Sequence, residues 1–246
     1  TISDGSIGGI TNTKGTVNIN GGSIKSVTNG TNKIKQGNVI ITDGTVSSSV
    51  GIENYGDLKI SGGTINGADS YHVKAIRNYG NVNITGGTIN AIAKWSSNYW
   101  DHDAYGIYND GGTITLGVKD GDVTENINIL ATSPQLTDAT SYACGIINYS
   151  GTLNMYDGVI KAKDDSIYGV VDEIEDNNEL VVNTVDDLLV ASLIEPTGVA
   201  YIGENTDNMY SNLQDAINAC SNDDTIKLVR NTTIVGNTRK IVSDDK

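Results

Sequence analysis

The residues best suited to chemistry gather in one short stretch, positions 94–105. This stretch reads KWSSNYWDHDAY and holds both tryptophans of the chain and one of its two histidines. Aromatic rings offer flat apolar surfaces on which a sugar ring can lie, and aspartate or asparagine side chains can bond the sugar hydroxyls. The composition therefore predicts a glycan-binding loop. Its expected ligand-contacting residues are Trp95, Tyr99, Trp100, Asp101, His102, Asp103 and Tyr105.

A purely structural role is the alternative for these aromatic residues. Large aromatic side chains are buried on average, so the loop could fold back and cover the flank of the protein. We weight this packing slightly above the glycan site. Exposure of Trp95 and Trp100 would separate a ligand-binding loop from a passive spacer.

Two groups of acidic residues have some features of a metal site. The consecutive residues 101–103 (DHD) cannot all reach one ion without ligands from elsewhere. Asp120 and Asp122 flank a glycine as in half a calcium loop, and Glu125 lies nearby, but the bidentate glutamate at loop spacing is missing. An ordinary polar turn is the favoured interpretation. We therefore expect no cofactor and keep Ca²⁺ bound by Asp120, Asp122 and Glu125 as the alternative.

Catalytic groups are sparse elsewhere. The two cysteines, Cys144 and Cys220, are not in a C-x-x-C pair and have no histidine close in sequence, which argues against a thiol nucleophile. Asp164 and Asp165 form an adjacent acidic pair, for which a solvated turn is favoured over a catalytic dyad. The sequence favours a non-enzymatic protein. If Asp101, Asp103 and either Asp164 or Asp165 lay within catalytic distance of one another in a groove, a polysaccharide lyase or glycoside hydrolase would be favoured instead.

Composition restricts the partners. The 246 residues carry 16 Lys and Arg against 30 Asp and Glu, a net charge of −14, which argues against nucleic acid because phosphates need a basic face. No apolar run approaches the ~20 residues that span a bilayer, and the first residues lack the parts of a signal peptide. Since the chain does not begin with Met, we expect a fragment whose export signal and anchor lie outside it.

The elements that must position these residues come from an internal repeat. The motif G-x-[VL]-x-I-x-x-G-[ST]-[IV] recurs along the first two thirds of the chain. Its copies begin at Gly15, Gly37, Gly56, Gly80 and Gly151, with a degenerate copy at Gly112. Apolar and polar residues alternate within each copy, which is the period of a strand with one buried face. Each copy therefore predicts three inward apolar positions that recur as columns.

A second block, ending in asparagine, precedes several copies. It reads GIENY at 51–55, AIRNY at 75–79, GIYND at 106–110 and GIINY at 145–149. Asparagine and the glycine after it tolerate left-handed backbone, so the block marks a recurring tight corner. We expect a corner ladder of Asn54, Asn78, Asn109 and Asn148 beside stacked Tyr55, Tyr79 and Tyr149.

The spacing of the copies predicts the fold class. The first four copies start 22, 19 and 24 residues apart, which suits one coil of a solenoid and is too short for a propeller blade. We expect an all-β protein, a parallel β-helix solenoid of about six to seven coils over 1–183. Insertions are expected at 91–105 and 117–142. Residues 184–200 are expected to form a strand and linker, and 201–246 a small helix-plus-strand segment.

The paired blocks resemble the right-handed parallel β-helix repeats of the pectate-lyase-like superfold, with the closest likeness to surface-anchored, adhesin-type proteins of Gram-positive bacteria. Residues 198–203, 210–217 and 224–228 are similar to the start of a further module in such proteins. The resemblance implies an extracellular, cell-surface stalk or adhesin whose loops bind a glycan or a host surface protein.

Enzymes of the same superfold define the alternative. The lyases use a calcium-bound acidic cluster with an Arg or Lys base, and the hydrolases use close-set aspartates on adjacent coils. This chain departs from both patterns, since Arg77 is the one arginine within the repeats. The departure favours the non-enzymatic interpretation.

The column assignment can be tested by placing a charge in one column. Ile84 occupies the second apolar position of its copy. Ile84→Asp is expected to unfold the middle coils, because a buried unpaired carboxylate costs several kcal/mol and stacked coils depend on their neighbours. A melting temperature that does not change would contradict the columns.

Overall fold

The protein is described from a computed structural model, which covers residues 1–68, 70–94, 102–134, 141–175, 178–194, 200–203, 209–210, 213–221 and 224–228. The described elements are strands apart from one short helix, which confirms the all-β class. The chain divides into two compact units. The first comprises Thr1–Glu175 and Leu180–Leu193, and the second contains the chain from Ile194 onward.

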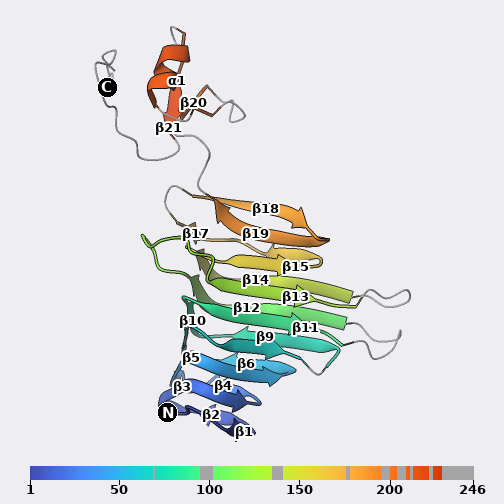
Figure 1. The fold of residues 1–246 in the computed structure, drawn as a ribbon. Coiled ribbons are helices and arrows are strands. Elements are labelled where there is room, and N and C mark those ends of the chain that lie inside the picture. The colour runs from blue at the N-terminus through green and yellow to red at the C-terminus, as the bar shows by residue number, and fades with distance from the viewer. Residues whose placement is uncertain are drawn as a thin grey trace. The chain divides into compact units, whose positions relative to one another are not determined.

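The strands of the first unit lie one above another in three ladders, which the chain visits in a fixed order (Figure 1). Ladder 1 is parallel throughout, and in all of its strands except β16 an asparagine stands at the end of the paired segment. It contains β2 (Ile10–Asn12), β4 (Val27–Asn29), β6 (Val50–Asn54), β9 (His72–Asn78), the first parts of β12 (His102–Leu116) and β14 (Ser141–Met155), and β16 (Asp165–Tyr168).

Ladders 2 and 3 follow along the chain and are also built of parallel pairs. Ladder 2 contains the first parts of β3 (Lys14–Ile24) and β5 (Gln36–Ser48), then β7 (Asp57–Ile60), β10 (Asn81–Ile84), the last parts of β12 and β14, and β17 (Glu173–Ile174). Ladder 3 contains β1 (Ser6–Ile7), the last parts of β3 and β5, β8 (Thr64–Gly67), β11 (Gly87–Ile92), β13 (Ile127–Thr132) and β15 (Val159–Ala162).

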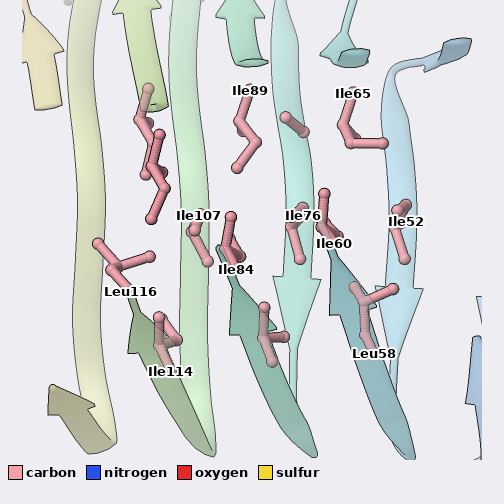
Figure 2. Close-up of a cluster of buried hydrophobic side chains, with 14 of the residues drawn as sticks. Ile52, Leu58, Ile60, Ile65, Ile76, Ile84, Ile89, Ile107, Ile114 and Leu116 are labelled. Carbon is pink, nitrogen blue, oxygen red and sulfur yellow. The ribbon is translucent and has the colours of Figure 1, made fainter. Parts of the chain in front are cut away.

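The core consists of the predicted apolar columns, which the strand register confirms. The second column runs through Ile19, Ile41, Ile60, Ile84, Leu116 and Met155, all fully or almost fully buried. Figure 2 shows inward side chains of neighbouring strands, among them Ile60, Ile84 and Leu116, side by side in this core. Burial of each such side chain stabilises the fold by roughly 1.5–3 kcal/mol.

The segments expected to be insertions partly belong to the ladders. Ile129 in β13 pairs with Ile89 and Ile160 and is buried, so it supplies the third column position that the degenerate copy at Gly112 lacks. The extra residues between Leu116 and β13 displaced this position along the chain and hid it from the repeat pattern. Likewise, the first segment contributes its ends, 91–92 and 102–105, to β11 and β12.

A buried asparagine ladder runs along the corner at the end of ladder 1. The predicted residues are present and two more extend the column, which comprises Asn12, Asn29, Asn54, Asn78, Asn109 and Asn148. Each side-chain N–H donates to the amide oxygen of the next asparagine at 2.8–3.1 Å. The remaining amide hydrogens reach backbone carbonyls, such as those of Gly56, Gly80 and Gly112.

The tyrosine stack beside this ladder is shorter than expected. Tyr55 and Tyr79 stack with ring centroids 4.7 Å apart and ring planes 7° from parallel. At the corresponding position, the next strand along the ladder, β12, has Asp110, and the register between β12 and β14 shifts there. Tyr149 in β14 therefore has no aromatic ring on which to stack. Tyr149 is accordingly 70% exposed.

The parallel stacking ends at a hairpin. β18 (Glu179–Val185) and β19 (Leu188–Ile194) are joined by Asp186 and Asp187, both with the positive φ that a two-residue hairpin turn requires. β19 pairs antiparallel with β15. Most of the segment expected as strand and linker, 184–200, therefore belongs to the first unit as far as Leu193.

The second unit is small. It contains β20 (Ala200–Ile202), helix α1 (Leu213–Ala219) and β21 (Ile226–Leu228), and β20 and β21 pair antiparallel. The helix places its apolar side against the pair. The buried residues are Ala200, Leu213, Ala216 and Ile217.

Removing one amide from the asparagine ladder should be costly. Asn78→Ala removes one acceptor of the Asn54 side chain and the asparagine donor to the amide oxygen of Asn109, and all three positions are buried. We expect the free energy of unfolding to fall by about 3–5 kcal/mol, measured by chemical denaturation.

Asn81→Ala provides the matched control. Asn81 is exposed and its side chain bonds Asp57 on the surface at 2.9 Å. Its removal should change stability by no more than about 0.5 kcal/mol. Equal losses for the two variants would contradict a stabilising role of the buried ladder.

Candidate functional site

Only part of the predicted glycan loop lies in the described residues. Trp95, Tyr99, Trp100 and Asp101 fall outside them, whereas His102, Asp103 and Tyr105 begin strand β12. Side chains alternate along this strand. His102 and Ala104 point inward and are fully buried, so the His102 ring is not presented to a ligand in solvent. Asp103 and Tyr105 lie on the opposite, partly exposed face.

The outward face of ladder 1 brings together side chains from three neighbouring strands. We call the surface formed by Lys74, Asp103, Tyr105, Tyr108 and Tyr142 the tyrosine face. Its ring centroids are 5.7 Å apart for Tyr105 and Tyr108 and 6.2 Å apart for Tyr105 and Tyr142. The Lys74 ammonium lies 5.1 Å from the Tyr105 centroid and 5.3 Å from that of Tyr108. Each distance is within the range of a cation–π contact.

Sequence reasoning missed Lys74, Tyr108 and Tyr142. Tyr108 occupies the variable position of the G-I-x-N block, and its register partner in β9 is Arg77. Because the isoleucine and asparagine of this block are buried, the residue between them must face outward. The block therefore contained the signal, but only the strand register shows which outward residues become neighbours.

One edge of the tyrosine face carries a contact between a histidine ring and a carboxylate. The His72 ring nitrogen Nδ1 lies 3.2 Å from the Asp103 carboxylate, and both side chains are partly exposed. The Tyr71 ring packs edge-on against His72 at a centroid distance of 4.8 Å. These contacts fix the orientation of Asp103 beside Tyr105.

Burial shapes the charges of the tyrosine face. It raises the pKa of Tyr105, with Asp103 adding to the effect, and raises the pKa of Tyr142, which also donates to Asp165 at 2.6 Å. Burial lowers the pKa of Lys74, and nearby Arg77 lowers it further. Tyr105 and Tyr142 therefore remain neutral at neutral pH and keep their hydroxyl hydrogens.

The described carboxylates weighed for catalysis, Asp103, Asp164 and Asp165, each contact a different partner. Asp103 is paired with His72, whereas Asp165 accepts a hydrogen bond from Tyr142. Their strands, β12 and β16, are separated by β14, which places the backbones about 10 Å or more apart. Asp164 accepts a hydrogen bond from the backbone N–H of Ala143 at 2.7 Å. The carboxylates thus have structural partners.

The residues weighed as calcium ligands act mainly through their backbone. The Asp120 N–H donates to both carboxylate oxygens of Glu175 at 3.0 and 3.1 Å, and the Glu125 N–H donates to Asp157 at 2.8 Å. Asp120, Asp122 and Glu125 are all exposed. Within the described parts of the chain, no three His, Cys, Asp or Glu side chains are grouped as metal ligands. Glu175 and Asp157 anchor this loop.

Comparison of the chain with protein-family models, with curated proteins and with solved structures found no match. Among the described helices, none is long and apolar enough to cross a membrane.

The two cysteines should differ in reactivity. Cys144 lies beneath the tyrosine face, is fully buried, and has a pKa raised to about 12, mainly by burial. Cys220 is partly exposed. Because the thiolate is the reacting species, iodoacetamide near pH 8 should modify Cys220 and spare Cys144 in the folded protein.

Peptide mass spectrometry measures the modification at each position. In denaturant both thiols should react, which serves as the control. Modification of Cys144 at the rate of Cys220 under native conditions would contradict the buried position.

Proposed function

We propose that the chain is a segment of a right-handed parallel β-helix in an extracellular bacterial surface protein, where it acts as a stalk and binds a neutral glycan on its tyrosine face. The observation that carries the binding proposal is the convergence of Tyr105 and Tyr108 on the Lys74 ammonium, with Tyr142 packed against Tyr105. The cell-surface location follows from the resemblance of the repeats.

The order of the ladders supports the β-helix. Successive strands pass from ladder 1 to ladder 2 to ladder 3, and the next strand returns to ladder 1 beside its predecessor in parallel. Parallel crossover connections are almost always right-handed. A stack of this kind is stabilised by contacts between neighbouring coils, which suits a rigid stalk.

The chemistry of the tyrosine face supports a glycan as its ligand. Neutral phenol rings present apolar carbon next to hydroxyl groups, a combination that matches the mixed surface of a sugar. Asp103 can accept hydrogen bonds from sugar hydroxyls and Lys74 can donate them. The Lys74 cation and the Asp103 anion lie together, which favours a neutral ligand over a strongly charged one.

A binding role fits these residues better than catalysis. Hydrolysis of a glycosidic bond requires two carboxyl groups facing each other across the bond. Asp103 and Asp165 are instead held by His72 and Tyr142 on strands that are not neighbours. We therefore propose a non-enzymatic protein.

The test is a glycan-array screen of the wild-type protein and of the double variant Tyr105→Ala/Tyr108→Ala. We expect the wild type to bind neutral glycans and the double variant to lose at least tenfold in affinity, roughly the effect of one or two stacking contacts. Thermal unfolding of both proteins shows whether the variant remains folded.

Tyr168→Ala is the matched control. Tyr168 in β16 occupies the position that corresponds to Tyr108 in the register of ladder 1, and it is 54% exposed. Strand β14 lies between the two tyrosines. It should bind as the wild type does. Absence of binding by the wild type, or full binding by the double variant, would contradict a glycan site on the tyrosine face.

A further inference from the structure

The corner that follows the asparagine ladder has one level without a ring. Tyr55 and Tyr79 come directly after Asn54 and Asn78, and their rings stack 4.7 Å apart. The corresponding level after Asn109 holds Asp110 and the additional residue Gly111. The pair of rings thus ends where a third ring would otherwise continue the stack.

An open hollow lies at this level. It is lined by Asn32, Lys35, Tyr55, Tyr79, Asp110 and Gly111. Gly111 has φ +95°, and a Cβ atom added there would meet nothing closer than the Ser150 hydroxyl oxygen at 3.9 Å. The side of the hollow formed by Gly111 is therefore unfilled.

A second hollow beside the tyrosines has a floor made of backbone. Its lining includes Gly56, Gly80 and Gly112, one from each of three successive levels. A Cβ atom at any of these glycines would lie 2.2–2.3 Å from the carbonyl oxygen of the level below, so only glycine fits. The glycines thus allow the backbones of successive strands to approach closely beside Tyr55 and Tyr79.

The tyrosine rings are held in place before any ligand arrives. The Tyr55 hydroxyl donates to Glu53 at 3.2 Å, and the same carboxylate pairs with Arg77 at 3.5 Å. The Arg77 guanidinium in turn lies over the Tyr79 ring, 4.9 Å from its centroid. A fixed aromatic surface binds with a smaller loss of side-chain entropy than a mobile one.

We infer that this corner hollow is a second carbohydrate-binding site, which takes one pyranose ring against Tyr79 at the level of Asp110 and Gly111. The carbon face of the sugar contacts the aromatic ring. The Asp110 carboxylate accepts hydrogen bonds from sugar hydroxyls, and the Lys35 ammonium donates to sugar oxygens. The site lies at the corner between ladders 1 and 2 and does not depend on the tyrosine face.

The residues around the hollow favour a sugar over an aromatic peptide side chain. Aromatic surface is confined to Tyr55 and Tyr79, while Asn32, Lys35 and Asp110 offer an amide, a cation and a carboxylate around it. A pyranose can use all of these groups, because hydroxyls surround its apolar face. A phenyl ring would use only the aromatic part.

The test uses saturation-transfer NMR and titration with methyl β-glycosides of glucose, galactose and N-acetylglucosamine. Gly111→Asn is the main variant, since asparagine tolerates positive φ and its side chain would occupy the hollow. Asp110→Ala removes the carboxylate. We expect affinity for the bound glycoside to fall at least tenfold in Gly111→Asn and about threefold to tenfold in Asp110→Ala.

Two further variants make the outcomes decisive. Tyr149→Ala removes an exposed tyrosine of the same block and should bind as the wild type does. Tyr105→Ala/Tyr108→Ala should also retain this site, which separates it from the proposed function. Thermal unfolding is measured for every variant.

Three results would overturn the inference. They are no glycoside binding by the wild type, full binding by a folded Gly111→Asn variant, and loss of glycoside binding only in Tyr105→Ala/Tyr108→Ala. A tyrosine-containing tripeptide serves as a competing probe. Binding of that peptide in the hollow without any glycoside binding would assign the hollow to a protein partner and would also overturn the carbohydrate site.

Discussion

The structure depends on a column of buried asparagine amides that must be satisfied in one register. Asn29, Asn54, Asn78 and Asn109 are fully buried, and an amide without partners at such a position would be strongly destabilising. Each amide donates to the next along the column. A strand shifted by one residue would lose these bonds and turn its apolar residues outward, so the column and the core select the same alignment.

This alignment decides what appears on the surface. When the buried residues of neighbouring strands are aligned, the outward-facing residues between them are aligned as well, whatever their type. At one such level of ladder 1 the sequence places Glu53, Arg77 and Tyr108 side by side. The geometry of the interior repeats from strand to strand, whereas the residues at the outward positions differ. The tyrosine face and the corner hollow both lie at these outward positions.

Much of the interior could be predicted, because it repeats. The alternation of apolar and polar residues predicts the columns, and the recurring asparagine followed by glycine predicts the corner. Ile129 was missed because a loop separates it from the rest of its copy, and a pattern of fixed spacing does not survive such an interruption. Asn29 was missed because no tyrosine or isoleucine accompanies it in Val27-Thr28-Asn29-Gly30.

The surface was less predictable for a physical reason. Tyr142 and Tyr105 are 37 positions apart, and Asp157 anchors a loop more than 30 positions before it. Such contacts depend on which strands are neighbours in a ladder. The connecting loops differ in length, so the sequence alone does not show which residues of two strands will be aligned. Even His102, chosen for its chemistry, is buried because strand alternation, rather than residue type, decides its direction.

Hydrogen exchange of the asparagine side chains tests the central claim most directly. In ¹⁵N-labelled protein transferred to D₂O, the side-chain amide protons of Asn29, Asn54, Asn78 and Asn109 should persist long after those of exposed Asn81 have exchanged, because the ladder buries and bonds them. Slow exchange of these four residues relative to Asn81 is the predicted result. Exchange of all five amides at the rate of Asn81 would contradict the buried ladder and the register that rests on it.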